Sequence, residues 1–145
     1  MMRENGGPFL IVAILAFTIL TLSAANSSSS LRAELQSSAV QQAEFTVVVN
    51  RNGFNGTLGA FNITVHQGDL VKITFVYGDT DLPYNNPHKI SIEDYNIHTD
   101  QISKSNPTVT VRFTADQAGT FSFYCTIYCI GMDKMQSGNL NVIPR

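Results

Sequence analysis

The residues best suited to chemistry lie in one short segment near the end of the chain. Between residues 125 and 135 the sequence carries two cysteines and two methionines: Cys125, Cys129, Met132 and Met135. Thiolate and thioether sulfurs are soft ligands, which suit Cu(I) and the copper–thiolate sites that carry electrons. The chain has only these two cysteines, and a disulfide between them would close too short a loop to stabilise a fold much. The pattern therefore predicts a metal-binding loop.

A histidine upstream is placed to join this loop. His88 opens a predicted strand at residues 88–92, and another predicted strand, 119–125, ends at Cys125. In antiparallel neighbours the start of one strand and the end of the other share a pole of the sheet. We therefore expect His88 and the cysteine loop to meet.

The two other histidines are placed differently. His66 precedes a predicted strand at residues 70–76, which should hold it roughly 20 Å from the pole of the cysteine loop. His98 follows the 88–92 strand in an irregular stretch. It either folds back toward the site or stays on the surface, whereas His66 is not expected to bind a metal.

The elements that must position these residues are short strands. Seven runs alternate apolar and polar residues and are separated by Gly, Asn, Asp and Pro, which is typical of strands and turns. They span residues 45–49, 61–65, 70–76, 88–92, 108–113, 119–125 and 138–143. Without a convincing helix pattern, they predict a single all-β domain at residues 45–145, an antiparallel sandwich or Greek-key barrel.

The first 44 residues differ in character. An apolar run follows Arg3, and its length fits either a membrane-spanning helix or a secretory signal. We expect residues 1–25 to be an N-terminal apolar helix that anchors the chain in a membrane, or a cleaved signal, and residues 26–44 to be a flexible tether. Both alternatives place the domain outside the cytoplasm, membrane-anchored or released as a secreted or periplasmic protein.

The charge of the domain excludes one class of function. From residue 45 onward there are seven Lys and Arg against eight Asp and Glu. A nearly neutral domain lacks the basic stripe that nucleic-acid binding requires. No nucleophile–base or carboxylate pair indicates catalysis by this chain alone, so a catalytic role would come from a complex that it joins.

Three phrases of the sequence together resemble the cupredoxin family. They are Ala118-Gly119-Thr120-Phe121-x-Phe123-Tyr124-Cys125, the upstream Asn86-Pro87-His88 and the closing Gly138-x-Leu140-x-Val142. The second cysteine narrows the likeness, because Cys125-x-x-x-Cys129 is similar to the dinuclear copper (CuA) loop of cytochrome c oxidase subunit II and of nitrous oxide reductase. The order of apolar segment, tether and domain also resembles the single-helix subunit II of some prokaryotic oxidases. This resemblance implies a Greek-key β-barrel with one or two copper ions.

The resemblance also implies a set of metal ligands. His88 matches the first histidine of the family, Cys125 and Cys129 match the bridging thiolates, and Ile127 matches the residue that offers a backbone carbonyl.

The second histidine of the family has no counterpart in this sequence. An ungapped match places Asp133 there and Gln136 at the methionine, whereas a one-residue deletion places Met132 and Met135 at these positions. No histidine follows His98. Met132, Asp133 or His98 would therefore have to take the place of the second histidine.

Several functions fit this ligand set. The first is electron transfer through a modified CuA-like site, with a redox partner protein or within a membrane oxidase complex. The second is an extracytoplasmic Cu(I) carrier that delivers copper to an enzyme, and the third is a metal-free accessory subunit of the same fold. A zinc site formed by Cys125, Cys129, His88 and Asp133 is a further alternative.

Overall fold

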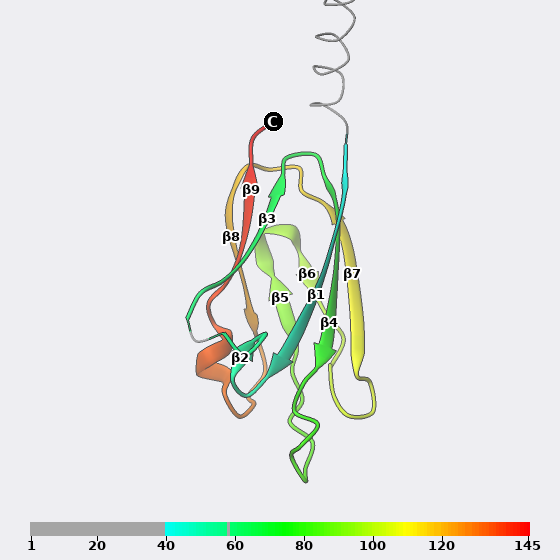
Figure 1. Ribbon diagram of the computed structural model, residues 1–145, viewed down its shortest axis with the longest axis vertical. Helices are drawn as coiled ribbons and strands as arrows, with labels where there is room; N and C mark the ends of the chain where they lie inside the picture. The colour runs from blue at the N-terminus through cyan, green and yellow to red at the C-terminus, as the bar shows by residue number, and fades with distance from the viewer. Residues whose placement is uncertain (1–39, 58) are drawn as a thin grey trace, which may run out of the picture. The chain divides into compact units, whose positions relative to one another are not determined.

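The alternation of apolar and polar residues along the strands decides which faces meet in the core. In the computed structural model, which describes residues 40–57 and 59–145, strand β4 (Leu70–Tyr77) buries every second side chain. Strand β1 (Gln42–Asn50) does the same toward its end, where Val47 and Val49 are fully buried. Two sheets pack their buried faces together, as a sandwich (Figure 1).

The first sheet has four strands and the second has five. The order in the first sheet is β2-β1-β4-β7, with β2 at Gly53–Phe54 and β7 at Thr108–Thr114. The second sheet has the order β3-β9-β8-β5-β6. Its strands are β3 (Phe61–His66), β9 (Gly138–Ile143), β8 (Gly119–Cys125), β5 (Ile90–Ile92) and β6 (Ile97–His98). Two short 3-10 helices, η1 (Glu93–Tyr95) and η2 (Met132–Met135), complete the described elements.

The predicted all-β fold is confirmed for the described residues, and each of the seven predicted runs contains a strand. The expectation of purely antiparallel pairing was wrong, because β1 pairs with β4, and β3 with β9, in parallel. Both parallel pairs arise because the chain crosses between sheets, entering the second sheet as β3 before it returns to the first as β4. His88 itself forms an isolated bridge with Ile102, and β5 begins two residues later.

The N-terminal boundary of the domain lies slightly earlier than predicted. β1 begins at Gln42, three residues inside the predicted tether, and Gln42 pairs in register with Leu70 of β4. The sequence did not predict this extension because polar side chains interrupt the apolar alternation there. One of them, Glu44, forms an ion pair with Lys72 of β4 at 2.9 Å. The predicted anchor or signal at residues 1–25, its apolar helix and residues 26–39 of the tether lie outside the described residues. Within the described part of the chain, no helix is long and apolar enough to cross a membrane.

Aromatic packing fixes the end of β8 that leads to the cysteines. Phe123 is fully buried and its ring lies 4.8 Å from that of Phe54, centre to centre. Gly138 opposes Phe123 in the register between β8 and β9. A β-carbon at position 138 would lie 2.3 Å from the Phe123 ring, so only glycine lets the ring occupy this space. Cys125 follows two residues later on the same face.

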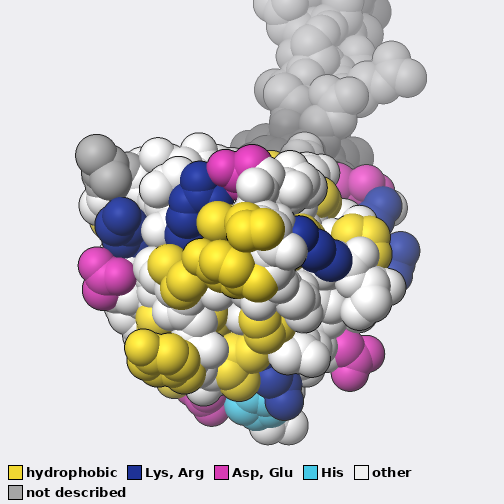
Figure 2. Space-filling view, turned by 90° about the horizontal axis from the view of Figure 1, so that it is seen from below, with side chains coloured by type: hydrophobic (Ala, Val, Ile, Leu, Met, Phe, Trp, Pro, Cys, Tyr) yellow, Lys and Arg dark blue, Asp and Glu magenta, His cyan; other side chains and the backbone are white. Residues whose placement is uncertain are grey.

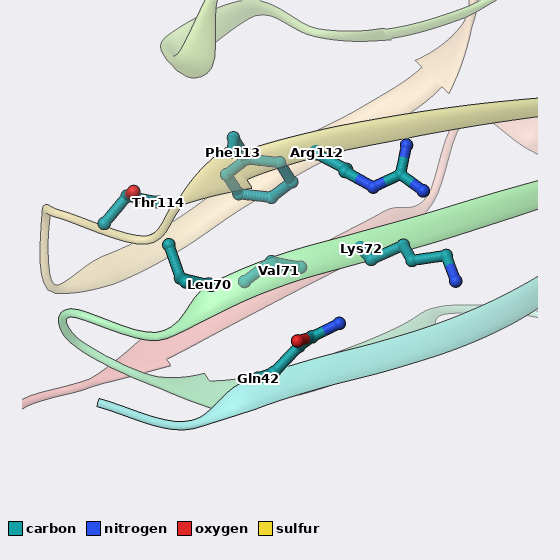
Figure 3. A pocket seen from close by; sticks show the side chains of 7 residues that line it. All are labelled: Gln42, Leu70, Val71, Lys72, Arg112, Phe113 and Thr114. Carbon is teal, nitrogen blue, oxygen red and sulfur yellow. The ribbon is translucent and has the colours of Figure 1, made fainter. Parts of the chain in front are cut away.

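A surface pocket lies at the end of the first sheet that is remote from the cysteines (Figure 3). It is lined by side chains of β1, β4 and β7, among them Leu70, Lys72 and Arg112. Leu70 is the first residue of β4, whereas the cysteine pole lies beyond its last residue, Tyr77. A strand of this length separates the pocket from the cysteines by about 20 Å.

The turn between β3 and β4 depends on a buried carboxylate. Asp69 is 2% exposed, and its oxygens accept hydrogen bonds from the backbone N–H of His66 at 2.8 Å and of Gln41 at 3.3 Å, and from the Arg145 guanidinium. Burial alone would raise the pKa of Asp69, but the hydrogen bonds and the charge of Arg145 outweigh it and lower the pKa. A depressed pKa in the folded state contributes stability above the pKa of the unfolded chain, and this contribution is lost as pH falls.

We therefore predict that Asp69→Asn lowers the free energy of unfolding at pH 7 by about 2 kcal/mol. The difference from the wild type should shrink below about pH 4, where the unfolded carboxyl becomes protonated. Urea unfolding at a series of pH values measures both effects. Asp100→Asn, at an exposed position, is the control and should change neither. An Asp69→Asn deficit that stayed constant down to pH 2 would contradict the assignment.

Candidate metal centre

Two thiols meet where β8 ends. Cys125 is the last residue of β8 and lies opposite Ile90 of β5 in the register. Cys129 lies in the following loop, and its Sγ is 3.5 Å from that of Cys125. The side chains are almost fully buried, with 1% exposure for Cys125 and 6% for Cys129. Both cysteines are free thiols and belong to the hydrophobic core.

His88 joins the two thiols from the neighbouring segment. Its backbone exchanges two hydrogen bonds with Ile102, which fix it just before β5. The imidazole is fully buried, and its ligand nitrogen and the two sulfurs all lie within 4.8 Å of one another. Among the described residues, this is the one group of three or more His, Cys, Asp and Glu side chains arranged to hold a metal ion.

The imidazole of His88 satisfies one of its nitrogens within the protein. Nε2 lies 3.0 Å from Oδ2 of Asp79, a carboxylate that is also fully buried. Nδ1 has no hydrogen-bond partner, and no other buried side-chain nitrogen or oxygen in the described part of the chain shares this condition. A buried nitrogen without a partner is costly, and a metal ion beside two thiolates would remove that cost.

Asn86 connects the cysteine loop to the same carboxylate. Its Nδ2 donates to Asp79 Oδ2 at 2.7 Å and to the Ile130 carbonyl at 3.1 Å, and its Oδ1 accepts from the Ile130 N–H at 2.8 Å. On the other side of the loop, Gln136 donates to the carbonyls of Cys125 and Met132. The loop is therefore fixed on both sides of Cys129.

The two thiols share their protons unequally. The hydrogen bond from Cys129, with further ones from the backbone, outweighs burial and lowers the pKa of Cys125 to about 4. The same contact, together with burial, raises the pKa of Cys129. A cation that binds both sulfurs would displace the protons of the pair.

The other predicted ligands take different positions. The Ile127 carbonyl oxygen lies 3.5 Å from Cys125 Sγ, next to the site. Met135 is fully buried in the core that contains both cysteines, and Met132 is half-buried against it. Asp133 is exposed and does not belong to the group formed by His88 and the cysteines.

The two remaining histidines lie outside this group. His98 is on β6, where its Nδ1 is 2.7 Å from the Ser91 hydroxyl, so the chain does not fold it back onto the thiols. His66 ends β3 and pairs with Ile143 at the far end of β9. The near end of β9, at Gly138, pairs with Phe123 beside the cysteines.

Sequence reasoning did not find Asp79 and Asn86 as parts of the site. Asp79 follows β4 by two residues and therefore lies at the pole that β8 reaches. The sequence did contain one indication of this role, because Asp79 directly follows a strand that ends at the same pole as His88. Asn86 belongs to the Asn86-Pro87-His88 phrase, but nothing in the sequence shows that its side chain joins the loop to Asp79.

Comparison with known proteins agrees with this geometry. A model of the cupredoxin-like domain family matches residues 10–142. The chain belongs to the cupredoxin-like family. The buried imidazole and the thiols at one pole of its β-sandwich are the donor types that copper proteins use.

The similar proteins are larger copper proteins. The chain is 30% identical over 79 residues to a copper-containing nitrite reductase from Pseudomonas chlororaphis, a match over 50% of this chain and 20% of that protein. The fold is similar to that of a copper nitrite reductase from Nitrosomonas europaea (TM-score 0.51, 20% identity, 72% of this chain and 42% of that chain). It is also similar to the multicopper oxidase mgLAC (TM-score 0.55, 21% identity, 73% of this chain and 40% of that chain). The chain thus spans a fifth of the curated relative's length, and the closer likeness to oxidase subunit II stays a prediction.

The loop geometry can be tested at a glycine that has no room for a side chain. Gly131 has φ +81°, and a β-carbon there would lie 2.0 Å from the carbonyl oxygen of Arg51. Gly56 also has a positive φ, +67°, but nothing lies within 4 Å of its virtual β-carbon.

We predict that Gly131→Ala destabilises the fold by about 2 kcal/mol more than Gly56→Ala, because both pay for the backbone conformation and only the first adds a clash. Gly131→Ala should also move the Cys129 loop and weaken metal binding. Gly56→Ala should leave metal binding unchanged. Thermal unfolding and metal titration measure the two effects. Equal destabilisation by both variants would contradict the packing of Gly131 on Arg51.

Proposed function

We propose that the domain binds copper through His88, Cys125 and Cys129 and transfers electrons. The observation that carries this proposal is the buried His88 ring, which lies within 4.8 Å of two thiols and whose Nδ1 has no hydrogen-bond partner among the described residues. Bound copper would supply a one-electron redox couple. The residues would exclude water from it and hold its ligands in place.

Rigidity favours electron transfer. Cys125 ends a paired strand, His88 is bridged to Ile102, and Asn86 and Gln136 hold the loop between them. A site fixed in this way changes little between two oxidation states, which lowers the cost of moving an electron. Met135, buried in the same core, is the proposed additional sulfur ligand.

The likeness to the CuA loop extends the proposal. The Cys125-x-x-x-Cys129 spacing and the carbonyl of Ile127 beside Cys125 support a modified CuA-like site with one or two copper ions. From the sequence, we also propose that residues 1–25 place the domain at the outer face of a membrane. Its partner there would be a redox protein or a membrane oxidase complex.

Cu(I) carriage is the second candidate, and the donor set favours it. The group contains one imidazole and two thiols, and soft sulfur ligands stabilise Cu(I) over Cu(II). A carrier would bind Cu(I) tightly and give no reversible couple, so spectroscopy separates the two functions.

The test is to load the purified protein with copper and record optical and electron paramagnetic resonance spectra. Coloured copper–thiolate bands that disappear and return on reduction and oxidation support electron transfer. Hyperfine structure from two equivalent coppers indicates the dinuclear form, and an intense blue band indicates one copper. Tight, colourless Cu(I) binding supports the carrier instead, and no binding under reducing conditions excludes both.

We predict that Cys125→Ser abolishes copper binding, because it removes the thiolate that both His88 and Cys129 face. His66→Ala is the matched control and should retain the full copper-to-protein ratio, since His66 lies at the opposite end of β3 and β9. Metal analysis after removal of free copper measures both. Loss of copper from His66→Ala would contradict the placement of the site.

The surface around this pole suits a redox partner. Figure 2 views the lower pole of Figure 1 and shows apolar side chains gathered there between basic ones. In the loops next to the site, Tyr128 is 93% exposed and Tyr84 and Ile130 are about half exposed. Exposed apolar side chains that gather on one face mark interaction sites, and close approach here brings a partner near the sulfurs.

A second copy of the protein can serve as a probe of this surface. We predict that Tyr128→Glu slows electron self-exchange between oxidised and reduced copper protein at least tenfold. The reason is that the added carboxylates of two molecules would repel when their apolar poles approach. Leu70→Glu, which alters an exposed apolar residue near the surface pocket, should leave the rate unchanged. Nuclear magnetic resonance line broadening in mixtures of the two states measures the rate. Equal rates for both variants would contradict docking at this pole.

A further inference from the structure

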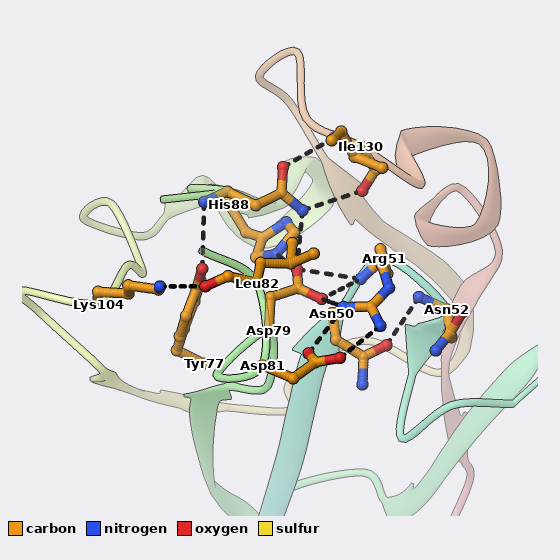
Figure 4. A network of polar contacts seen from close by, with 11 residues as sticks. Asn50, Arg51, Asn52, Tyr77, Asp79, Asp81, Leu82, His88, Lys104 and Ile130 are labelled. Carbon is orange, nitrogen blue, oxygen red and sulfur yellow. Dashed lines mark hydrogen bonds and ion pairs between the residues drawn. The ribbon is translucent and has the colours of Figure 1, made fainter. Parts of the chain in front are cut away.

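Asp79 lies in the loop after β4, and its carboxylate takes part in several hydrogen bonds. Its Oδ1 accepts from the backbone N–H of Arg51 at 3.0 Å and from the Arg51 guanidinium at 3.4 Å. Its Oδ2 accepts from Asn86 at 2.7 Å and lies 3.0 Å from Nε2 of the His88 ring. The Asp79 side chain is fully buried. Figure 4 shows it between Arg51 and His88.

This set of donors fixes the state of the His88 ring. A carboxylate only accepts hydrogen bonds, so the Nε2 that faces it carries the hydrogen. A neutral imidazole with hydrogen on Nε2 keeps its lone pair on Nδ1. Nδ1 is the buried atom without a partner and is the nitrogen left to face the two thiols. Asp79 thus decides which nitrogen is the ligand.

We propose that Asp79 is the positioning residue of this site, which fixes the tautomer and the rotation of the His88 ring and makes Nδ1 a stronger donor to an oxidised metal ion. A carboxylate that accepts from the far nitrogen of a ligating histidine increases the basicity of the ligand. A more basic nitrogen favours Cu(II) over Cu(I). Only this second effect rests on the proposed function, because the tautomer is a property of the metal-free protein.

Arg51 offsets the free-energy cost of burying the Asp79 carboxylate. Its guanidinium bridges the buried Asp79 and the exposed Asp81, at 3.4 Å and 2.7 Å, and its side chain is 32% exposed. A buried charge persists when it is paired and hydrogen-bonded. Asp81 is therefore the matched control residue, since it carries the same charge on the same arginine without reaching His88.

The alternative is that Asp79 only supports the fold, by holding Asn86 and Arg51. Such a role predicts lower stability and equally weaker binding of both copper oxidation states. It predicts no change in the tautomer of a protein that remains folded, and no change in reduction potential. These two readouts separate positioning from support.

The first experiment uses metal-free, 15N-labelled protein under reducing conditions. We expect the ring nitrogen shifts of wild-type His88 to show hydrogen on Nε2, with slow exchange of that hydrogen. Asp79→Asn should yield a mixture of tautomers, because an amide cannot accept from every one of these donors, and Asp81→Asn should match the wild type. Hydrogen on Nδ1 in the wild type would overturn the inference, and this result does not depend on the variant folding. An unchanged tautomer in folded Asp79→Asn would overturn it as well.

The second experiment uses copper. Loss of the carboxylate that accepts a hydrogen bond from a metal-ligating histidine lowers metal affinity by roughly 10- to 100-fold. We expect Asp79→Asn to weaken Cu(II) binding about tenfold more than Cu(I) binding, which corresponds to a reduction potential about 59 mV higher for one electron. Asp79→Glu should restore most of the difference, and Asp81→Asn should not move the potential. Equal losses for both ions would overturn the effect on the metal, whereas failure of the wild type to bind copper would refute the proposed function and leave the tautomer result standing.

Discussion

A histidine ring buried between two sheets must satisfy two nitrogens, and His88 satisfies one of them within the protein. The described structure around it follows from this constraint. Asp79 lies beyond the end of β4 to accept from Nε2, and Arg51 beyond the end of β1 neutralises that carboxylate. Where β8 ends, the sulfurs of Cys125 and Cys129 lie within 4.8 Å of a nitrogen of this ring. The segments that follow β1, β4 and β8 thus converge around one imidazole.

Packing beneath the pole makes this convergence rigid. Phe123 occupies the space that Gly138 leaves open, and this contact sets the end of β8 against the start of β9. The loop after β8 then passes so close to Arg51 that only Gly131 fits. The core therefore places the two sulfurs, and the proposed electron-transfer site would require such preorganisation.

Periodicity in the sequence was enough to predict the strands and the meeting of His88 with the cysteines. Alternation marks the strands, and antiparallel neighbours share their poles. The two-residue strands β2 and β6 could not be predicted because two residues show no period. The parallel pairs could not be predicted because alternation carries no information on strand direction. Asp79 escaped for a different reason. Its role depends on a hydrogen bond across nine residues of irregular chain, which the alternation of apolar and polar residues does not encode.

The missing second histidine is the point on which structure constrains the chemistry most. His98 is bonded to Ser91 at the sheet edge, and Asp133 is exposed. Of the three candidates, Met132 is the one that packs against the core containing the thiols, and Met135 is buried in that core. A thioether in place of an imidazole favours Cu(I), whereas the carboxylate behind His88 favours Cu(II). In the proposed site these two effects oppose each other, so the sulfur donors and Asp79 together would hold the potential where both oxidation states are accessible.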